Sequence, residues 1–147
     1  MPSQFQYHIR PADWDRDQVA IAAVRREVFI VEQCVPEHLE WEEEDGRHHW
    51  FVAETRLGVI GIARLTDHGR IGRMAVRRPF RGKGVGRALL EAALAAARAA
   101  GMTEVFLSAQ VQAMGFYARQ GFSAEGDEYQ DAGIPHRTMR LVFKELP

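Results

Sequence analysis

The spacing of apolar residues predicts most of the strands in this chain. Short runs with alternating or continuous apolar positions, bounded by glycine or proline, are typical of strands. Such runs occupy residues 7–10, 50–54, 59–65, 70–76, 104–108, 122 onward and 138–143. Pro11 ends the first run, and Leu57-Gly58 separates the second from the third, which predicts a hairpin. The last two runs are expected to pair with each other.

Apolar residues at helical spacing predict three helices between these strands. The first is capped by Asp13 or Asp15, and a short third helix covers residues 113–119. The apolar face of the first helix is expected to contain Ile21, Val24, Val28 and Val31. A second, longer helix runs from about 84 to 100 and ends at Gly101, and its apolar face is expected to contain Val85, Leu89, Ala92 or Ala93, and Ala96. This order of elements predicts a mixed sheet of the α/β or α+β class with helices on its faces.

The bulk composition is that of an ordinary globular protein. Its 147 residues suit one core, so residues 1–147 are expected to form a single domain. The formal net charge of −1 argues against a nucleic-acid partner, because nucleic-acid-binding domains are usually basic. The single cysteine, Cys34, excludes an internal disulfide and a thiolate zinc cluster. We expect a cytoplasmic protein with no membrane partner, since residues 1–8 lack a secretory signal pattern and the low-polarity run 88–97 is too short to span a bilayer.

The segment Arg81-Gly82-Lys83-Gly84-Val85-Gly86-Arg87 carries the sharpest chemical signal. Its three glycines let a ligand approach the backbone closely, and they lead directly into the predicted long helix. The first amides of a helix lack intrahelical partners, and the helix dipole adds positive charge there. Together with the three cationic side chains, this pattern predicts a binding site for a diphosphate.

Two common nucleotide-binding motifs do not fit this loop. The Walker A motif needs serine or threonine after its lysine, and none is present. The dinucleotide motif needs a third glycine, and Leu89 stands at that position. A plain turn before an amphipathic helix is a weaker interpretation, because it requires neither three glycines nor three cations.

Two motifs, Arg81–Gly86 and Phe116–Phe122, resemble signatures of one enzyme family. The former matches the (Gln/Arg)-x-x-Gly-x-(Gly/Ala) signature of the GNAT superfamily of N-acetyltransferases, and the latter is similar to its Phe-Tyr-x-x-x-Gly-Phe element. The likeness extends over nearly the whole chain. The family's first strand, first helix and fourth strand resemble residues 9–12, 25–29 and 73–76. Residues 28–33, followed by acidic residues, further resemble a small bacterial branch of the superfamily that is poorly characterised.

The resemblance implies a fold and a co-substrate. The fold is a mixed central sheet of about six to seven strands flanked by about four helices, with strands four and five splayed apart. The co-substrate is acetyl-CoA, bound without a metal. Its expected contacts are Met74, Ala75, Val76, Arg81, Gly82, Lys83, Gly84, Val85, Gly86, Arg87, Gln110 and Phe116. Gln110 is a departure from the family, because many members carry asparagine just after strand five.

The resemblance also implies the chemistry, which is direct attack of an amine on the acetyl carbonyl. A backbone amide near Ala75 or Val76 would stabilise the oxyanion. Tyr117 matches the family's general acid, which protonates the leaving thiolate, although a packing aromatic is the alternative role. Glu32 is our first candidate for the base that accepts the proton of the amine.

The identity of the base stays open between Glu32, Glu27, His136 and water. Each of these side chains, taken alone, also fits an ordinary surface or loop position. The acceptor is expected to be the primary amine of a small molecule or peptide. The acidic run over residues 37–45 either attracts a cationic amine or forms a solvated loop.

Two other functions remain as alternatives. The first is a non-catalytic acyl-CoA-binding or regulatory module on the same fold. The second is a nucleotide-binding domain, which would be stabilised by ATP or NAD and not by CoA. The sequence leaves the oligomeric state open between a monomer and a homodimer.

Overall fold

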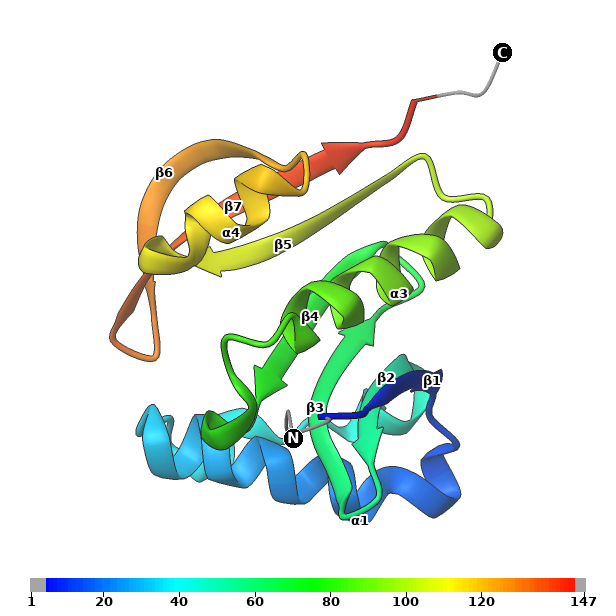
Figure 1. Cartoon of the computed structure of the whole chain (residues 1–147). Helices are drawn as coiled ribbons and strands as arrows, with labels where there is room; N and C mark the ends of the chain where they lie inside the picture. Colours follow the sequence, from blue (N-terminus) through cyan, green and yellow to red (C-terminus); the bar gives the residue numbers. More distant parts are fainter. Residues whose placement is uncertain (1–4, 145–147) are drawn as a thin grey trace.

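A sheet of seven strands lies at the centre of the molecule (Figure 1). The computed structural model describes residues 5–144, apart from the side chains of Glu43 and Glu44. The strand order is β1-β2-β3-β4-β5-β7-β6, and within the described residues only β4 and β5 pair in parallel. The strands are β1 (His8–Pro11), β2 (His49–Thr55), β3 (Gly58–Leu65), β4 (Arg70–Val76), β5 (Glu104–Gln110), β6 (Ser123–Asp131) and β7 (Ile134–Val142). All seven predicted strands are present, and the last two pair as expected.

Helices of three kinds connect these strands. The α-helices are α1 (Trp14–Arg25), α2 (Glu37–Glu40), α3 (Val85–Ala99) and α4 (Met114–Arg119). A π-helix covers Arg26–Glu32, and short 3-10 helices cover Glu43–Arg47, Arg78–Phe80 and Val111–Ala113. No helix within residues 5–144 is long and apolar enough to cross a membrane. Residues 1–4, which belong to the segment expected to lack a signal, lie outside the described part.

The first helix follows its prediction at the start and departs from it at the end. The side chain of Asp13 caps α1 by accepting a hydrogen bond from the amide of Asp15. Val28 is buried as expected, with Ile21 and Val24, but Val31 is 70% exposed. The prediction for Val31 is therefore wrong. Its physical reason is the π-helix, whose i→i+5 hydrogen bonds widen the turn and rotate Val31 off the apolar face.

Helices α1 and α3 cover opposite faces of the sheet (Figure 1). On β2, Trp50 packs in the cluster that contains α1 residues, while its neighbour Phe51 packs in the cluster that contains α3 residues. Gly61 of β3 lets α3 come close, because a Cβ there would lie 3.0 Å from Leu89 Cδ1 and 3.2 Å from the carbonyl oxygen of Ala75. This close packing fixes the start of α3 beside the end of β4.

Strands β4 and β5 separate soon after they begin. They pair only at Arg70 with Phe106 and at Ile71 with Leu107 among the described residues. Arg73 then adopts a positive φ of 48°, and the register between β3 and β4 shifts at the same level. Figure 1 shows β4 and β5 diverging along their length. The predicted splay of strands four and five is thus confirmed, and beyond Ile71 it leaves the edge of β4 that faces β5 without a strand partner among residues 5–144.

Candidate active site

A cavity of about 230 Å³ opens where β4 and β5 separate. The π-helix and its end, β4, β5, α4 and β7 all contribute to its wall. The lining side chains that can bind a polar ligand or transfer a proton include Arg70, Arg73, Ser108, Gln110, Tyr117 and His136. Of the predicted site residues, Met74, Gln110 and Tyr117 line this cavity, whereas Glu32 does not.

The glycine-rich loop lies between β4 and α3. Gly84 is the N-cap residue of α3 and has a φ of 85°, which side chains rarely adopt. Because Gly84 has no side chain, no side-chain cap satisfies the first amides of α3. A Cβ on Gly86 would lie 3.9 Å from Phe116 Cζ, so the loop and α4 are adjacent. The two motifs that are far apart in the sequence therefore meet in space.

The side chains of the loop differ in what they contact. Val85 is buried in the core, so only its backbone faces a ligand. Lys83 is exposed, with its Nζ 5.4 Å from the ring centre of Phe5. A Cβ on Gly84 would lie 3.9 Å from the hydroxyl of Tyr7, a neighbour that no sequence motif indicated. The described start of the chain thus flanks the loop.

Arg81 ties the loop to the π-helix. Its guanidinium donates two hydrogen bonds of 2.7 Å to the carboxylate of Glu32, and its Nε donates one of 2.7 Å to the carbonyl of Val76. Arg78 adds an ion pair to Glu32 at 3.4 Å. The hydrogen bonds from Arg81 hold the pKa of the Glu32 carboxyl below its usual range. This arrangement disfavours the predicted base role of Glu32, because an ion-paired carboxylate outside the cavity is a weak proton acceptor.

Glu27, another base candidate, has a similar position. Its carboxylate accepts a hydrogen bond of 3.0 Å from Nε of Arg77, just after β4. Both carboxylates of the π-helix thus hold the segment between β4 and α3. Neither lines the cavity.

Tyr117 points from α4 toward β4. Its ring packs edge-on against Phe116 and Phe122, and its hydroxyl donates to the sulfur of Met74 at 3.9 Å. A thioether is a weak acceptor, so the hydroxyl is available to a better partner. Burial raises the pKa of the Tyr117 hydroxyl to about 12. The group is therefore protonated at neutral pH and can donate a proton or a hydrogen bond into the gap.

His136 brings a nitrogen base to the same cavity. It is 8% exposed and lies opposite Gln110 in the pairing of β5 with β7. Its Nδ1 is 2.6 Å from the carbonyl oxygen of Ile134. Because a carbonyl only accepts, Nδ1 carries the hydrogen, and the Nε2 of the neutral ring is left as the basic nitrogen. Among the base candidates with side chains, His136 is the one that lines the cavity.

Gln110 links β5 to the end of the π-helix. Its Nε2 donates a hydrogen bond of 3.1 Å to Oε1 of Gln33, at the end of the π-helix. Its Oε1 accepts one of 2.7 Å from Gln112. The contact of Gln110 with the co-substrate stays a prediction.

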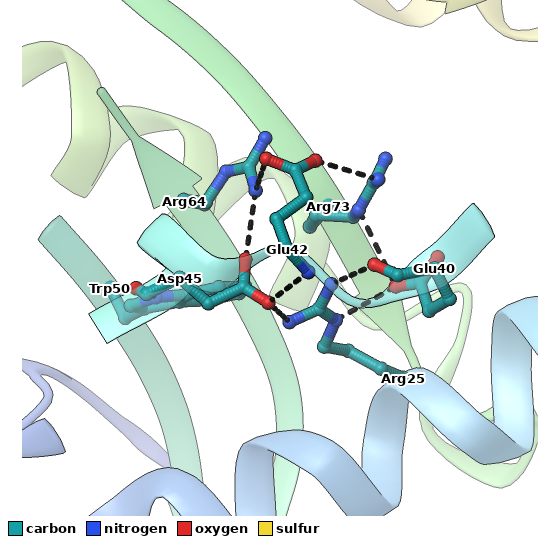
Figure 2. A network of polar contacts seen from close by, with 7 residues as sticks. All are labelled: Arg25, Glu40, Glu42, Asp45, Trp50, Arg64 and Arg73. Carbon is teal, nitrogen blue, oxygen red and sulfur yellow. Dashed lines mark hydrogen bonds and ion pairs between the residues drawn. The ribbon is translucent and has the colours of Figure 1, made fainter. Parts of the chain in front are cut away.

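A closed ring of six alternating charges lies beside the cavity (Figure 2). Glu40 joins Arg25 and Arg73, Glu42 joins Arg73 and Arg64, and Asp45 joins Arg64 and Arg25. The contacts range from 2.7 Å to 3.5 Å. Trp50 supports the ring, because its Nε1 donates to the carbonyl of Asp45 at 2.8 Å.

This ring changes the interpretation of the acidic run. Glu40 and Asp45 are 2% and 6% exposed, so this part of the run is neither a solvated loop nor a free negative surface. The side chains of Glu43 and Glu44 lie outside the described residues. The sequence held one signal of these ion pairs. Arg64 interrupts an apolar run, and an arginine buried there requires a carboxylate partner.

Comparison with known proteins agrees with the geometry. Residues 12–143 match the family described as acetyltransferase (GNAT) domain. The uncharacterized N-acetyltransferase YjcF from Bacillus subtilis is 38% identical over 79% of this chain and 86% of its own length. An acyl-CoA N-acyltransferase from Pseudomonas aeruginosa has a similar structure, with a TM-score of 0.80, 31% identity and coverage of 93% of this chain and 100% of that one.

A more distant structure shares the fold. It is N-acetylglutamate synthase from Neisseria gonorrhoeae complexed with coenzyme A and N-acetyl-glutamate, which has a TM-score of 0.72 and 20% identity over 97% of this chain and 36% of its own. The family match and the relative at 38% identity indicate acyl-CoA-dependent acetyl transfer. The chain belongs to the GNAT acetyltransferase family.

Proposed function

We propose that this protein transfers the acetyl group of acetyl-CoA to the primary amine of a small molecule or peptide by direct attack. One observation carries the proposal: the Tyr117 hydroxyl lies beside Met74 of β4, inside the cavity that opens between β4 and β5. The glycine-rich loop begins just beyond the end of the same strand. Acetyl-CoA with its pyrophosphate bound at the loop would therefore extend its pantetheine arm, which ends in the thioester, along β4 toward Tyr117.

The residues present fit the co-substrate. Beyond Ile71, the edge of β4 that faces β5 has no strand partner among the described residues. The backbone groups of Met74 and Ala75 on this edge are therefore available to the amides of the pantetheine arm, whereas the carbonyl of Val76 already accepts a hydrogen bond from Arg81. The loop from Gly82 to Arg87 offers helix-start amides to the pyrophosphate. Phe116 lies close to Gly86 at the start of α3, where it would contact the bound arm.

The chemistry follows from three groups around the gap. The Nε2 of His136 accepts a proton from the acceptor ammonium, directly or through a water molecule, which frees the nitrogen lone pair. As the nitrogen–carbon bond forms, an amide of β4 near Ala75 or Val76 stabilises the carbonyl oxyanion. The carbon–sulfur bond then breaks, Tyr117 protonates the departing thiolate, and the second proton that the nitrogen loses as it becomes an amide restores the Tyr117 hydroxyl, directly or through water.

The test is release of free CoA thiol from acetyl-CoA in the presence of a panel of primary amines, with the acetylated product identified by mass. Turnover that requires an amine supports the proposal. Tight CoA binding without turnover on any acceptor would instead favour a non-catalytic acyl-CoA-binding module. Thermal stabilisation by ATP or NAD but not by CoA would favour a nucleotide-binding domain.

A further inference from the structure

The space available to the acceptor is small. An outer cavity of about 170 Å³ adjoins the inner one, and Arg64, Arg70, Arg73 and His136 line both. Each cavity is smaller than ~300 Å³, where pockets for drug-sized ligands begin. The inner cavity must also admit the thioester. The acceptor that reaches His136 through the outer cavity is therefore expected to be small.

The ring of charges in Figure 2 adds no net charge to this cleft. Each of its three carboxylates lies within 3.5 Å of two arginines, and each arginine contacts two carboxylates. Glu37, the remaining described carboxylate of the acidic run, pairs with Arg26 at 2.8 Å, so each described carboxylate of the run has an arginine partner. A polycationic acceptor would need unpaired carboxylates, so this arrangement does not favour its binding.

Two side chains of opposite charge line the cleft and do not belong to the ring. Arg70 and Asp131 line both cavities, and neither side chain has a hydrogen bond or ion pair within the described part of the chain. The ring itself contains two buried nitrogens without a hydrogen bond, the Nε atoms of Arg64 and Arg73, and the latter lies 3.4 Å from Oε1 of Glu40. Both atoms are enclosed in the protein, so the donor that a ligand in the cleft can reach is the exposed guanidinium of Arg70. A guanidinium without a protein partner suits a carboxylate ligand.

We infer that the acceptor is a small amino acid, whose carboxylate binds on the arginine side of the cleft with Arg70 as its main partner. Its ammonium lies toward Asp131 and the Nε2 of His136. The inference rests on the proposed function and adds the substrate class. It accounts for the one unpaired cation and the one unpaired anion that the described residues bring to the same small cleft.

The experiment compares each of several small amino acids with its decarboxylated amine, for example valine with isobutylamine. The two compounds share the reacting group and differ in the carboxylate. We expect kcat/KM to be at least about tenfold higher for the amino acid. Equal or better use of the decarboxylated amines would overturn the inference and leave the proposed function intact.

Arg70→Gln tests the assigned partner. We expect the preference for the amino acid over its decarboxylated amine to fall about tenfold, through KM more than kcat. Arg16→Gln is the matched control, because it removes the same charge from an exposed position on α1 outside the cleft. A full preference in Arg70→Gln would contradict the assignment of Arg70.

Binding provides a readout that is independent of turnover. Titration calorimetry with the CoA-bound protein should give a lower Kd for N-acetylvaline than for N-isobutylacetamide, and Arg70→Gln should remove the difference. Absence of any difference in the wild-type protein would overturn the inference. If no amine is acetylated but this difference in binding persists, the proposed function fails while the carboxylate site stands.

Discussion

Both oxygens of the Glu32 carboxylate accept hydrogen bonds of 2.7 Å from the guanidinium of Arg81, across 49 positions of the sequence. This contact fastens the start of the glycine-rich loop to the end of the π-helix. Arg81 also donates to the last carbonyl of β4. The position of the loop relative to the cavity therefore depends on a pair of residues for which the sequence predicted separate roles.

Glu32→Gln separates a positioning role from a base role. Loss of the bidentate pair should loosen the loop, and we expect KM for acetyl-CoA to rise about fivefold to tenfold with a small change in kcat. If Glu32 is the base, kcat should instead fall by about 10²-fold or more, with an unchanged KM for acetyl-CoA. Glu125→Gln, which removes an exposed carboxylate paired with Arg140 on β7, is the control and should match the wild type.

Tyr117→Phe tests the proton donor. We expect kcat to fall by about 10²-fold while CoA affinity changes little, because the hydroxyl contacts only a thioether in the described residues. Steady-state kinetics and titration of CoA provide the two measurements. Full activity in this variant would leave Tyr117 as a packing residue.

The pH profile gives an independent check on the same group. Tyr117 must be protonated to act, and its pKa is raised by burial to about 12. Its proton is lost only as the pH rises through that value, so kcat at saturating substrates should stay level from about pH 8 to 10. A decline of kcat in this interval that is absent in Tyr117→Phe would contradict the raised pKa.

His136→Gln tests the base. Glutamine retains hydrogen-bonding groups but cannot accept the proton at neutral pH, so we expect kcat to fall by about 10²-fold or more at pH 7. The loss should shrink at higher pH, where more of the acceptor is already deprotonated. His38→Gln, at an exposed position on α2, should behave as the wild type. An equal loss at every pH would contradict the base role.

The parts of the site that were predictable are those written into contiguous sequence. The glycines of the loop and the Phe116-Tyr117 pair are local motifs, and the apolar periodicity of α3 fixes which face packs on the sheet. The predicted burial of Val31 was wrong because the helix period of 3.6 residues does not hold where the backbone becomes π-helical. Widening of this kind leaves no reliable trace in hydrophobic spacing.

The charge ring could not be derived because its partners are distant in sequence. Arg64 and Asp45 come from β3 and a 3-10 helix, and only the tertiary fold makes their pairing possible. The same is true of Arg81 with Glu32. A charged residue inside an apolar run signals that a partner exists, but it does not identify the partner.

Gly84→Glu tests the loop as the diphosphate site. The substitution puts bulk and negative charge beside the helix-start amides, and we expect CoA affinity to fall by more than about 10²-fold. The φ of 85° also strains any side chain, so Gly101→Glu, at a φ of 81° after the far end of α3, is the control for backbone strain. Only Gly84→Glu should lose CoA binding at equal thermal stability. Unchanged CoA affinity would overturn the assignment of the loop.

Asp45→Asn tests the contribution of the charge ring to stability. Asp45 contacts Arg25 at 2.8 Å and Arg64 at 3.1 Å, and both guanidiniums are buried. Removing the charge leaves each of these buried cations with one carboxylate partner fewer, so we expect the free energy of unfolding to fall by about 3 kcal/mol. Asp67→Asn is the control, because its ion pair with His49 is exposed and should contribute less than about 1 kcal/mol. Urea denaturation of both variants measures the free energies of unfolding. If that free energy falls no more in Asp45→Asn than in Asp67→Asn, the ring adds little to stability and serves to shape the cleft.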